Sequence, residues 1–183
     1  MVKLIQVAWK HFTEYGYAES SMEEIVAEAE LTRGALYHHF GSKKGLFQAV
    51  LESVQTEISE RVEAEAARSD DALEQLILGS RAFVAAAVEP RIRRILLIDG
   101  PAVLGWEAWR RMDEENSMRH LREQLELMQR QGCLKPVPLD ALTHFVSGAL
   151  NESALWIAQS PDADQSLEET ISVISHFLKA FAH

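Results

Sequence analysis

The stretch Ser20–Val50, SSMEEIVAEAELTRGALYHHFGSKKGLFQAV, decides the fold of the first part of the chain. Ser21 is a favourable helix N-cap, and Glu24, three residues later, completes the pattern of a capping box. Thr32 can cap a second short helix, which Gly41 would end. The stretch therefore predicts two short helices joined by a tight turn, followed by the start of a third helix.

The second of these helices, residues 33–39, combines a short apolar face with polar and aromatic residues on its other side, namely Arg33, Tyr37, His38 and His39. Arginine can contact a base edge through two hydrogen bonds, while tyrosine and histidine side chains can bond phosphates. A short helix held across another by a turn is the helix-turn-helix arrangement of DNA-binding proteins. The same residues also suit the solvated face of a small helical bundle, because helix–turn–helix patterns are common in all-α proteins.

The run Leu31–Glu52, LTRGALYHHFGSKKGLFQAVLE, resembles the DNA-binding signature of the TetR (tetracycline-repressor-like) family of bacterial regulators. The resemblance is dense over the first 50 residues, whereas the rest of the chain is similar to the family only in length and helical layout. The residues that carry it are Ile5, Ala8, Phe12, Gly16, Tyr17, Met22, Ile25, Thr32, Arg33, Gly34, Leu36, Tyr37, His38, His39, Phe40, Lys43, Leu46 and Phe47.

This resemblance implies a set of contacts with double-stranded DNA. Thr32, Arg33 and Gly34 would meet DNA at the start of the recognition helix. The remaining expected contacts are to phosphates or base edges, from Tyr37, His38, His39, Lys43 and Ser21. The resemblance also implies a homodimer formed by the last two helices of each subunit, which would place two recognition helices on a palindromic operator.

Composition and periodicity indicate an all-α protein. Of the 183 residues, 47% are hydrophobic, and only five prolines and nine glycines interrupt the chain. Apolar spacing predicts about nine helices, over residues 2–15, 22–29, 33–39, 43–68, 71–88, 90–98, 106–131, 139–159 and from 162 or 164 to the end. We expect a helix-turn-helix DNA-binding domain over residues 1–45 and a ligand-binding and dimerisation domain over residues 46–183.

The charge distribution is unusual for a DNA-binding protein. The net charge is −10, but residues 1–50 contribute little of it, so the acidity lies mostly in the remainder of the chain. Members of the resembled family usually carry a short basic arm before the first helix, and this sequence begins almost at that helix. These two features motivate an alternative, a dimeric helical ligand-binding protein without effective DNA binding.

The middle of the chain would hold a ligand pocket if the family pattern carries over. Aromatic residues, methionines and a few polar groups suit a flat lipophilic or aromatic effector, whose binding would release a repressor from DNA. The candidates are Phe83, Trp106, Trp109, Met112, Met118, Met128, Phe145, Asn151 and Trp156. Each of these side chains, taken singly, also suits an ordinary helical core.

Other classes of protein find little support. The sequence has no glycine-rich phosphate loop, no nucleophile elbow and no paired-cysteine metal motif, so we expect neither enzyme activity nor a cofactor nor a bound metal. An all-α enzyme remains a third alternative, which only a turnover assay would reveal. The single Cys133 fits a reducing compartment, and no apolar run is long enough to cross a bilayer. We therefore expect a cytoplasmic bacterial protein, associated with the nucleoid when bound to DNA.

Overall fold

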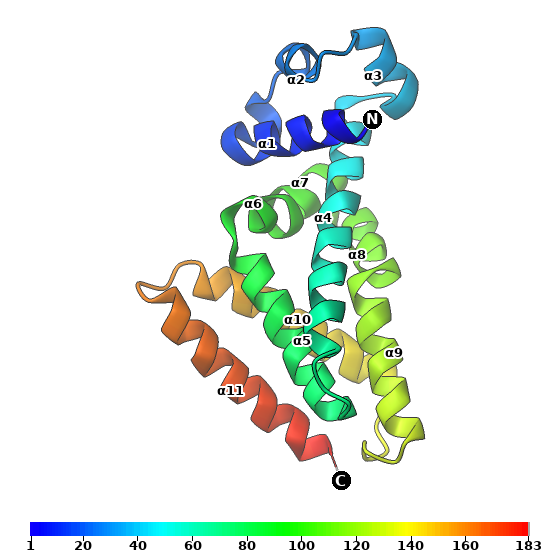
Figure 1. Ribbon diagram of the computed structural model, residues 1–183, viewed down its shortest axis with the longest axis vertical. Coiled ribbons are helices and arrows are strands. Elements are labelled where there is room, and N and C mark those ends of the chain that lie inside the picture. Colours follow the sequence, from blue (N-terminus) through cyan, green and yellow to red (C-terminus); the bar gives the residue numbers. More distant parts are fainter. Residues whose placement is uncertain (183) are drawn as a thin grey trace. The chain divides into compact units, whose positions relative to one another are not determined.

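A computed structural model describes residues 1–182, which are helical almost throughout (Figure 1). The helices are α1 (Val2–Glu19), α2 (Met22–Glu28), α3 (Arg33–Phe40), α4 (Lys43–Ala66), α5 (Ala72–Val88), α6 (Pro90–Arg93), the π-helical segment η1 (Arg94–Asp99), α7 (Gly100–Leu104), α8 (Trp106–Glu115), α9 (Ser117–Arg130), α10 (Leu139–Ile157) and α11 (Ala163–Phe181). The predicted all-α class is confirmed. Within the described residues, no helix has both the length and the apolar character that crossing a bilayer requires.

Two stretches differ from the expected helices. The single helix expected over residues 106–131 is divided at Asn116, whose backbone (φ −120°, ψ −95°) leaves the helical region. Asparagine competes for its own backbone hydrogen bonds and so favours such a boundary. The sequence predicts no helix between residues 98 and 106, but Gly100–Leu104 form α7, with Pro101 in its first turn. Proline is tolerated there because the first helical N–H groups have no partner within the helix.

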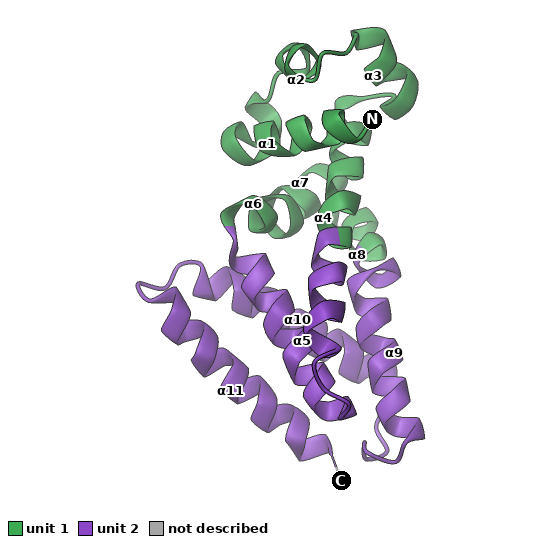
Figure 2. Cartoon of the chain, in the orientation of Figure 1, with its two compact units in different colours: residues 1–56, 90–112 green, residues 57–89, 113–183 purple. Residues whose placement is uncertain are grey.

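The chain forms two compact units (Figure 2). The first contains residues 1–56 and 90–112, and the second contains residues 57–89 and 113–183. The helix α4 contributes residues to both units, and so does α8. The domain division at residue 45 stays a prediction, because a compact unit is a different property from a functional domain.

The first unit is built around the inner faces of α1, α2, α3 and α4. An aromatic cluster joins α1 to α4, with the ring of Phe47 lying 5.4 Å from Phe12 and 5.3 Å from Tyr17 between centroids. Leu36 is the buried residue of α3 and ties the short helix to this core. The segment α6–η1–α7 packs its own apolar residues, Ile92, Ile95 and Leu96, against the unit, and they are almost completely buried.

The second unit is a bundle in which α10 is central. It packs against α5, α9 and α11, while α5 also contacts α9 and α11. The buried side of α10 carries Leu142, Val146, Leu150, Ala154 and Ile157, at the spacing of one helical face. A single antiparallel bridge between Leu134 and Ala182 ties the connector after α9 to the end of α11.

Candidate nucleic-acid interface and internal cavity

The local sequence fixes both short helices of the helix-turn-helix. Ser21 Oγ accepts a hydrogen bond from the Glu24 backbone N–H at 3.3 Å, and Thr32 Oγ1 accepts one from Ala35 N–H at 3.2 Å. The predicted N-caps are therefore confirmed. The Ser21 hydroxyl also donates a hydrogen bond to the carboxylate of Glu23 at 3.2 Å.

Arg33 opens α3 and is exposed, as a residue that reads DNA must be. Its guanidinium lies 2.6 Å from a carboxylate oxygen of Glu23 on α2, and both side chains are more than half exposed. The Glu23 backbone N–H, the Ser21 hydroxyl and nearby Arg33 together hold the pKa of the Glu23 carboxyl below its ordinary value. Arg33 therefore starts from an ion pair that DNA would have to displace.

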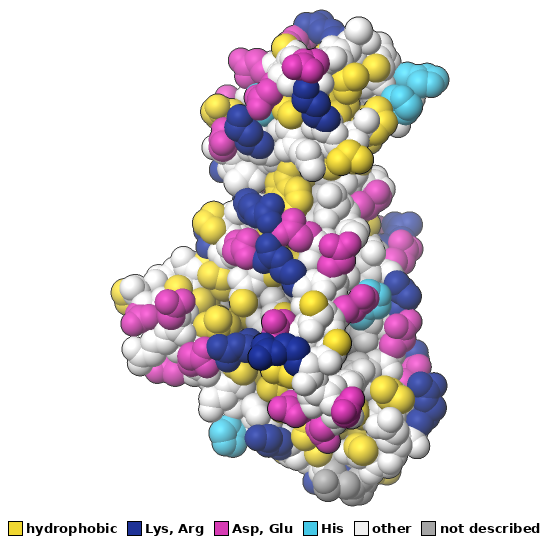
Figure 3. Space-filling view, in the orientation of Figure 1, with side chains coloured by type: hydrophobic (Ala, Val, Ile, Leu, Met, Phe, Trp, Pro, Cys, Tyr) yellow, Lys and Arg dark blue, Asp and Glu magenta, His cyan; other side chains and the backbone are white. Residues whose placement is uncertain are grey.

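The other candidates on α3 are all exposed to solvent. Tyr37 is 52% exposed, and His38 and His39 are also exposed, with their rings packed edge to face at 5.2 Å. Thr32 and Gly34 are exposed at the start of the helix. Figure 3 shows histidines protruding beside this part of the first unit, and acidic and basic side chains interspersed over the visible face. The side chains are available to DNA, but no basic patch covers this view.

Lys43 is placed differently from the other DNA-contact candidates. Its ammonium donates a hydrogen bond to the Ala18 carbonyl at 3.0 Å and lies 4.9 Å from the centre of the Tyr17 ring. Both partners lie at the end of α1, where an ammonium group stabilises the last carbonyls of the helix. The phosphate contact expected of Lys43 stays a prediction, as does that of Ser21.

Arg91 and Arg94 fasten α6 and η1 to α1. Arg94 donates to the Thr13 carbonyl at 3.2 Å, and the indole N–H of Trp9 donates to the Arg91 carbonyl at 3.2 Å. The Arg91 guanidinium also lies 4.7 Å from the centre of the Trp9 ring. Because these partners are more than 75 residues apart in sequence, no local pattern could have indicated them.

A second polar link joins α1 to α2. Glu28 accepts from Lys10 Nζ at 2.8 Å, and its other oxygen lies 2.8 Å from Nε2 of the buried His11. The hydrogen bond from Lys10, followed by that from His11, lowers the pKa of the Glu28 carboxyl. This link fixes α2 and therefore the base on which α3 rests.

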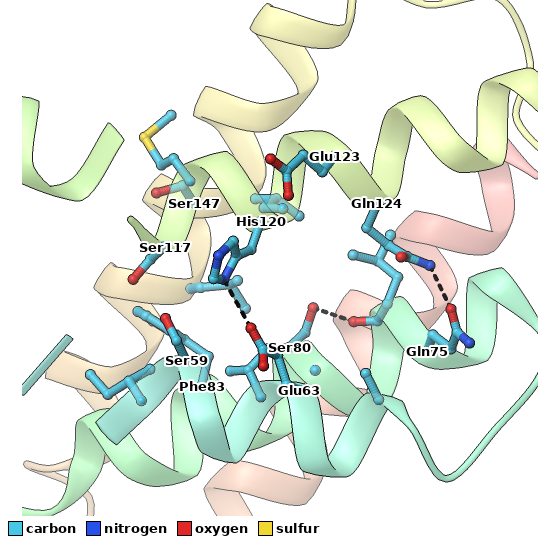
Figure 4. Close-up of a pocket in the computed structure, with 18 of the residues that line it drawn as sticks. Ser59, Glu63, Gln75, Ser80, Phe83, Ser117, His120, Glu123, Gln124 and Ser147 are labelled. Carbon is cyan, nitrogen blue, oxygen red and sulfur yellow. Dashed lines mark hydrogen bonds and ion pairs between the residues drawn. The ribbon is translucent and has the colours of Figure 1, made fainter. Parts of the chain in front are cut away.

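The second unit contains a cavity of about 410 Å³ (Figure 4). Its wall comes from α4, α5, α9 and α10, with Asp113 from the end of α8. The apolar lining includes Ile58, Val62, Leu76, Phe83, Met118, Leu121, Leu127 and Leu150; the polar lining includes Ser59, Glu63, Gln75, Ser80, Asp113, Ser117, His120, Glu123, Gln124, Arg130 and Ser147. A mostly apolar cavity with a few polar groups is the usual form of a small-molecule site.

Of the predicted ligand contacts, Phe83 and Met118 line this cavity. The others lie elsewhere. Met128 is fully buried core, and the Asn151 side-chain oxygen is buried without a hydrogen-bond partner but is not part of the lining. Met112 belongs to the first unit.

Phe145 and Trp156 occupy the outer side of α10, where they are 61% and 53% exposed. Their positions follow from helix geometry, because Phe145 lies about 200° around the helix from the cavity residue Ser147. Phe145 instead stacks on Phe177 of α11, with ring centroids 5.1 Å apart. In the described structure neither of these two side chains lines the cavity.

The two remaining tryptophans lie in the first unit and outside the cavity lining. Trp109 is buried, and its indole N–H donates to the Leu96 carbonyl in η1 at 2.7 Å. Trp106 is 64% exposed and its ring lies 5.0 Å from that of Trp109.

The serines and glutamines of the actual lining carried no distinctive sequence signal, because isolated polar residues in helices are common on solvated faces.

The geometry defines a helix-turn-helix protein with a second, cavity-bearing helical unit. Residues 4–50 match the family described as bacterial regulatory proteins, tetR family, and residues 73–181 match the tetracyclin repressor-like C-terminal domain. These matches cover most of the chain, which therefore belongs to the TetR family.

Individual relatives agree with this assignment. The chain is 36% identical to a TetR-family transcriptional regulator from Pectobacterium atrosepticum, with a TM-score of 0.80 and coverage of 99% of this chain and 93% of that one. The resorcinol complex of RolR has the same fold, with a TM-score of 0.72 at 19% identity, covering 98% of this chain and 90% of that one.

Similarity to a curated relative extends over a shorter range. The A-factor receptor protein of Streptomyces griseus is 31% identical over 109 residues, which are 58% of this chain and 37% of the relative. The chain thus spans from about a third to half of the length of the first curated relatives it matches, 37% and 48% respectively.

Proposed function

We propose that the protein is a transcriptional repressor that binds a palindromic operator in double-stranded DNA as a homodimer and is released by a small lipophilic effector. The proposal rests on the residues that α3 exposes to solvent. There Arg33, Tyr37, His38 and His39 are exposed on a short helix whose Leu36 is anchored in the core. Such a helix can enter a major groove without unfolding its support.

The roles of the individual DNA contacts follow from their chemistry. Arg33 would read a base edge once it leaves Glu23, with Thr32 and Gly34 approaching the DNA beside it. Tyr37, His38 and His39 would bond phosphates or base edges, and Ser21 and Lys43 would bond phosphates.

Dimerisation through α10 and α11 is supported by the apolar residues that these helices expose. Trp156 and Val173 are 53% and 68% exposed, and Phe145 extends the same kind of surface on α10. Large exposed apolar side chains indicate an interaction surface. A two-fold axis through such a surface would present two copies of α3 to successive major grooves.

Effector control would act through the cavity. The helix α4 supplies Ile58, Ser59 and Val62 to its wall and begins at Lys43, two residues after Gly41, the C-cap of α3. An effector that displaces this wall would therefore change the position of α3 through a continuous helix. To shift the protein almost completely from the conformation that binds the operator to the one that does not, the effector must bind the second conformation more tightly by about 5.5 kcal/mol. RolR, which has the same fold, holds resorcinol in its crystal structure.

The test is a selection of duplex fragments from the source genome by the purified protein at moderate salt. The native chain should enrich a palindrome, and Arg33→Ala/Tyr37→Ala should not. Enrichment by neither protein would contradict the proposal. It would instead favour the second candidate, a helical ligand-binding protein without effective DNA binding, which the Arg33–Glu23 pair and the net charge of −10 support.

The proposed setting is the bacterial cytoplasm, with the protein on the nucleoid while it is bound to its operator. No catalytic role is proposed, because the family to which the chain belongs consists of regulatory proteins.

A further inference from the structure

The cavity wall contains a buried serine hydroxyl that lacks the hydrogen bond such a group normally makes. Ser117 Oγ is buried without a partner. Ser147 is only 7% exposed, and among the described residues neither its hydroxyl nor that of Ser59 has a hydrogen-bond partner. By contrast, the hydroxyl of Ser80 donates to the Leu76 carbonyl at 2.7 Å. Buried polar groups are usually satisfied, so the buried hydroxyl of Ser117 points to a ligand that satisfies it, and the hydroxyls of Ser147 and the half-buried Ser59 line the same cavity.

These hydroxyls gather on one side of the cavity. In Figure 4 Ser59, Ser117 and Ser147 lie on one side, and Gln75 and Gln124 lie on the other. On α9, Ser117 and Gln124 are seven residues apart, which corresponds to about 10 Å along a helix. The Gln124 side-chain amide is already bound to the Ala72 carbonyl at 2.9 Å and to the Gln75 side chain at 3.0 Å. The serine hydroxyls therefore stay available to a ligand, whereas the Gln124 amide nitrogen is already engaged.

The apolar groups of the lining suit an aromatic ring. Phe83 and Met118 both line the cavity and are 8% and 4% exposed. A phenylalanine ring and a methionine sulfur both make favourable contacts with an aromatic ligand. Further apolar wall is supplied by Val62, Leu121 and Leu127, which could accept an aliphatic substituent.

The charged groups of the lining disfavour an anion. The lining includes three acidic residues, Glu63, Asp113 and Glu123, and one guanidinium, that of Arg130. The imidazole of His120 lies 3.9 Å from Glu63, and Arg119 lies 3.4 Å from Glu123, so the acids still outnumber the nearby cations. A ligand carboxylate would meet this excess of like charge. An uncharged ligand avoids that repulsion.

We infer that the effector is an uncharged lipophile with an aromatic ring and a hydroxyl group, a substituted phenol or a closely related aryl alcohol. Its hydroxyl exchanges hydrogen bonds with Ser117 and Ser147, and its ring lies against Phe83 and Met118. Its apolar substituent extends along the wall toward Leu127. This inference rests on the proposed function, because it assigns a chemical class to the effector of that same cavity.

The experiment compares three probes with the same tail and different head groups: 4-heptylphenol, 4-heptylanisole and 4-heptylbenzoate. Their dissociation constants for the full chain are measured by titration calorimetry at pH 7, where a phenol with a pKa near 10 is neutral. The phenol should bind more tightly than the ether by about two- to tenfold, which is the effect of one hydrogen bond. The benzoate should bind most weakly.

Variants connect that preference to the serines. Ser147→Ala, and separately Ser117→Ala, should reduce the preference for phenol over ether while leaving ether binding unchanged. Ser172→Ala is the matched control, since Ser172 is exposed on α11 and outside the lining. Unchanged ether binding would also show that each variant keeps its fold.

Equal binding of phenol and ether, benzoate binding as tight as phenol binding, or no binding of any probe would overturn the inference. Operator selection gives an independent readout. A chain that selects an operator but binds no probe retains the proposed function and refutes the phenol assignment. A chain that shows the phenol preference but selects no DNA supports the ligand class and refutes the repressor.

Discussion

At Arg33 a surface ion pair competes with a proposed DNA contact. The guanidinium lies 2.6 Å from Glu23, and both side chains are exposed. Exposed pairs contribute only about 0.2–1 kcal/mol, so Glu23 can orient Arg33 without preventing its transfer to a base edge or phosphate.

Arg33→Ala should weaken operator binding by about 1–3 kcal/mol and relax the sequence preference, because a bidentate base contact is lost. Fluorescence anisotropy on the selected operator and on single-base variants measures both effects. Arg68→Ala provides the control, since Arg68 is equally exposed and forms an ion pair with Glu65 in the second unit. Unaltered affinity and preference would remove Arg33 from the set of reading residues.

Glu23→Gln should have the opposite effect. It frees Arg33 and removes a negative charge beside the proposed phosphate path, so affinity for duplex DNA should rise by about 0.2–1 kcal/mol. Glu24→Gln is a matched control from the same turn of α2, because Glu24 contributes the same charge while the ion pair of Arg33 is with Glu23. An equal gain from both variants would show a general charge effect and contradict a specific role for the pair.

The sequence predicted residue-level capping well and tertiary partners poorly. Ser21 and Thr32 each accept the backbone N–H three residues later, because capping depends only on local chain geometry. The partners of Lys43, by contrast, are set by how α1 packs on α4. The same limit applies to Trp109, whose indole is directed to a carbonyl in η1 rather than to a ligand.

At the scale of elements, the position of α2 depends on the polar link between α1 and α2. Glu28 has a pKa below its ordinary value of 4.5, so its ionised form is stabilised in the folded chain. A lowered carboxyl pKa adds stability above the unfolded pKa, and this stability is lost as the pH falls through the folded pKa.

Glu28→Gln should therefore lower the melting temperature at pH 7, and its difference from the native chain should shrink as the pH falls below 4.5. Thermal unfolding of both proteins from pH 7 to pH 3 measures this convergence. Glu19→Gln supplies a control from an exposed acid at the end of α1. A difference that stays constant to pH 3 would show that the carboxylate charge is not the source of the stability.

The end of α1 depends on Gly16. Its φ of +80° and ψ of 167° lie in a region that only glycine occupies readily, and a Cβ there would lie within 2.2 Å of the Arg94 guanidinium. The sequence predicts that the first helix ends at residue 15, whereas in the structure Gly16 is a kink and α1 continues to Glu19. The second role of Gly16, as the close neighbour of Arg94, required the packing of η1 on α1.

Gly16→Ala should destabilise the chain by about 1–3 kcal/mol from backbone strain, with an added loss as Arg94 is displaced from the Thr13 carbonyl. Denaturant unfolding gives the change in the free energy of unfolding. Gly132→Ala separates the two effects, because Gly132 also has a positive φ of 73° but no atom lies within 4 Å of its added Cβ. Equal costs at both positions would contradict the contribution of the Arg94 contact.

At the scale of the whole molecule, the sequence indicated the all-α fold and the helix-turn-helix, because both are set by local periodicity and caps. It located only part of the cavity. Phe83 and Met118 line it, whereas Phe145 and Trp156 lie on the outer side of α10. Aromatic composition alone could not distinguish a cavity wall from an exposed face, since both use large apolar side chains.

That exposed face leads to a prediction about assembly. Trp156→Glu/Val173→Glu should convert the proposed dimer to a monomer at micromolar concentration, because the charges would be buried between like surfaces. Sedimentation velocity measures the mass, and circular dichroism shows that the helices remain. Trp106→Glu, at an exposed tryptophan outside α10 and α11, is the control. A dimer that persists in the double variant would place the interface elsewhere.

The most direct test of the central claim is the operator affinity of the native chain and of Arg33→Ala/Tyr37→Ala, measured at several salt concentrations on the selected palindrome and on a scrambled duplex. The account predicts that the native chain prefers the palindrome, that its affinity falls with salt, and that the double variant loses the preference while keeping its fold. Equal affinity of the native chain for both duplexes, or an unchanged preference in the variant, would contradict the assignment of α3 as the element that reads DNA.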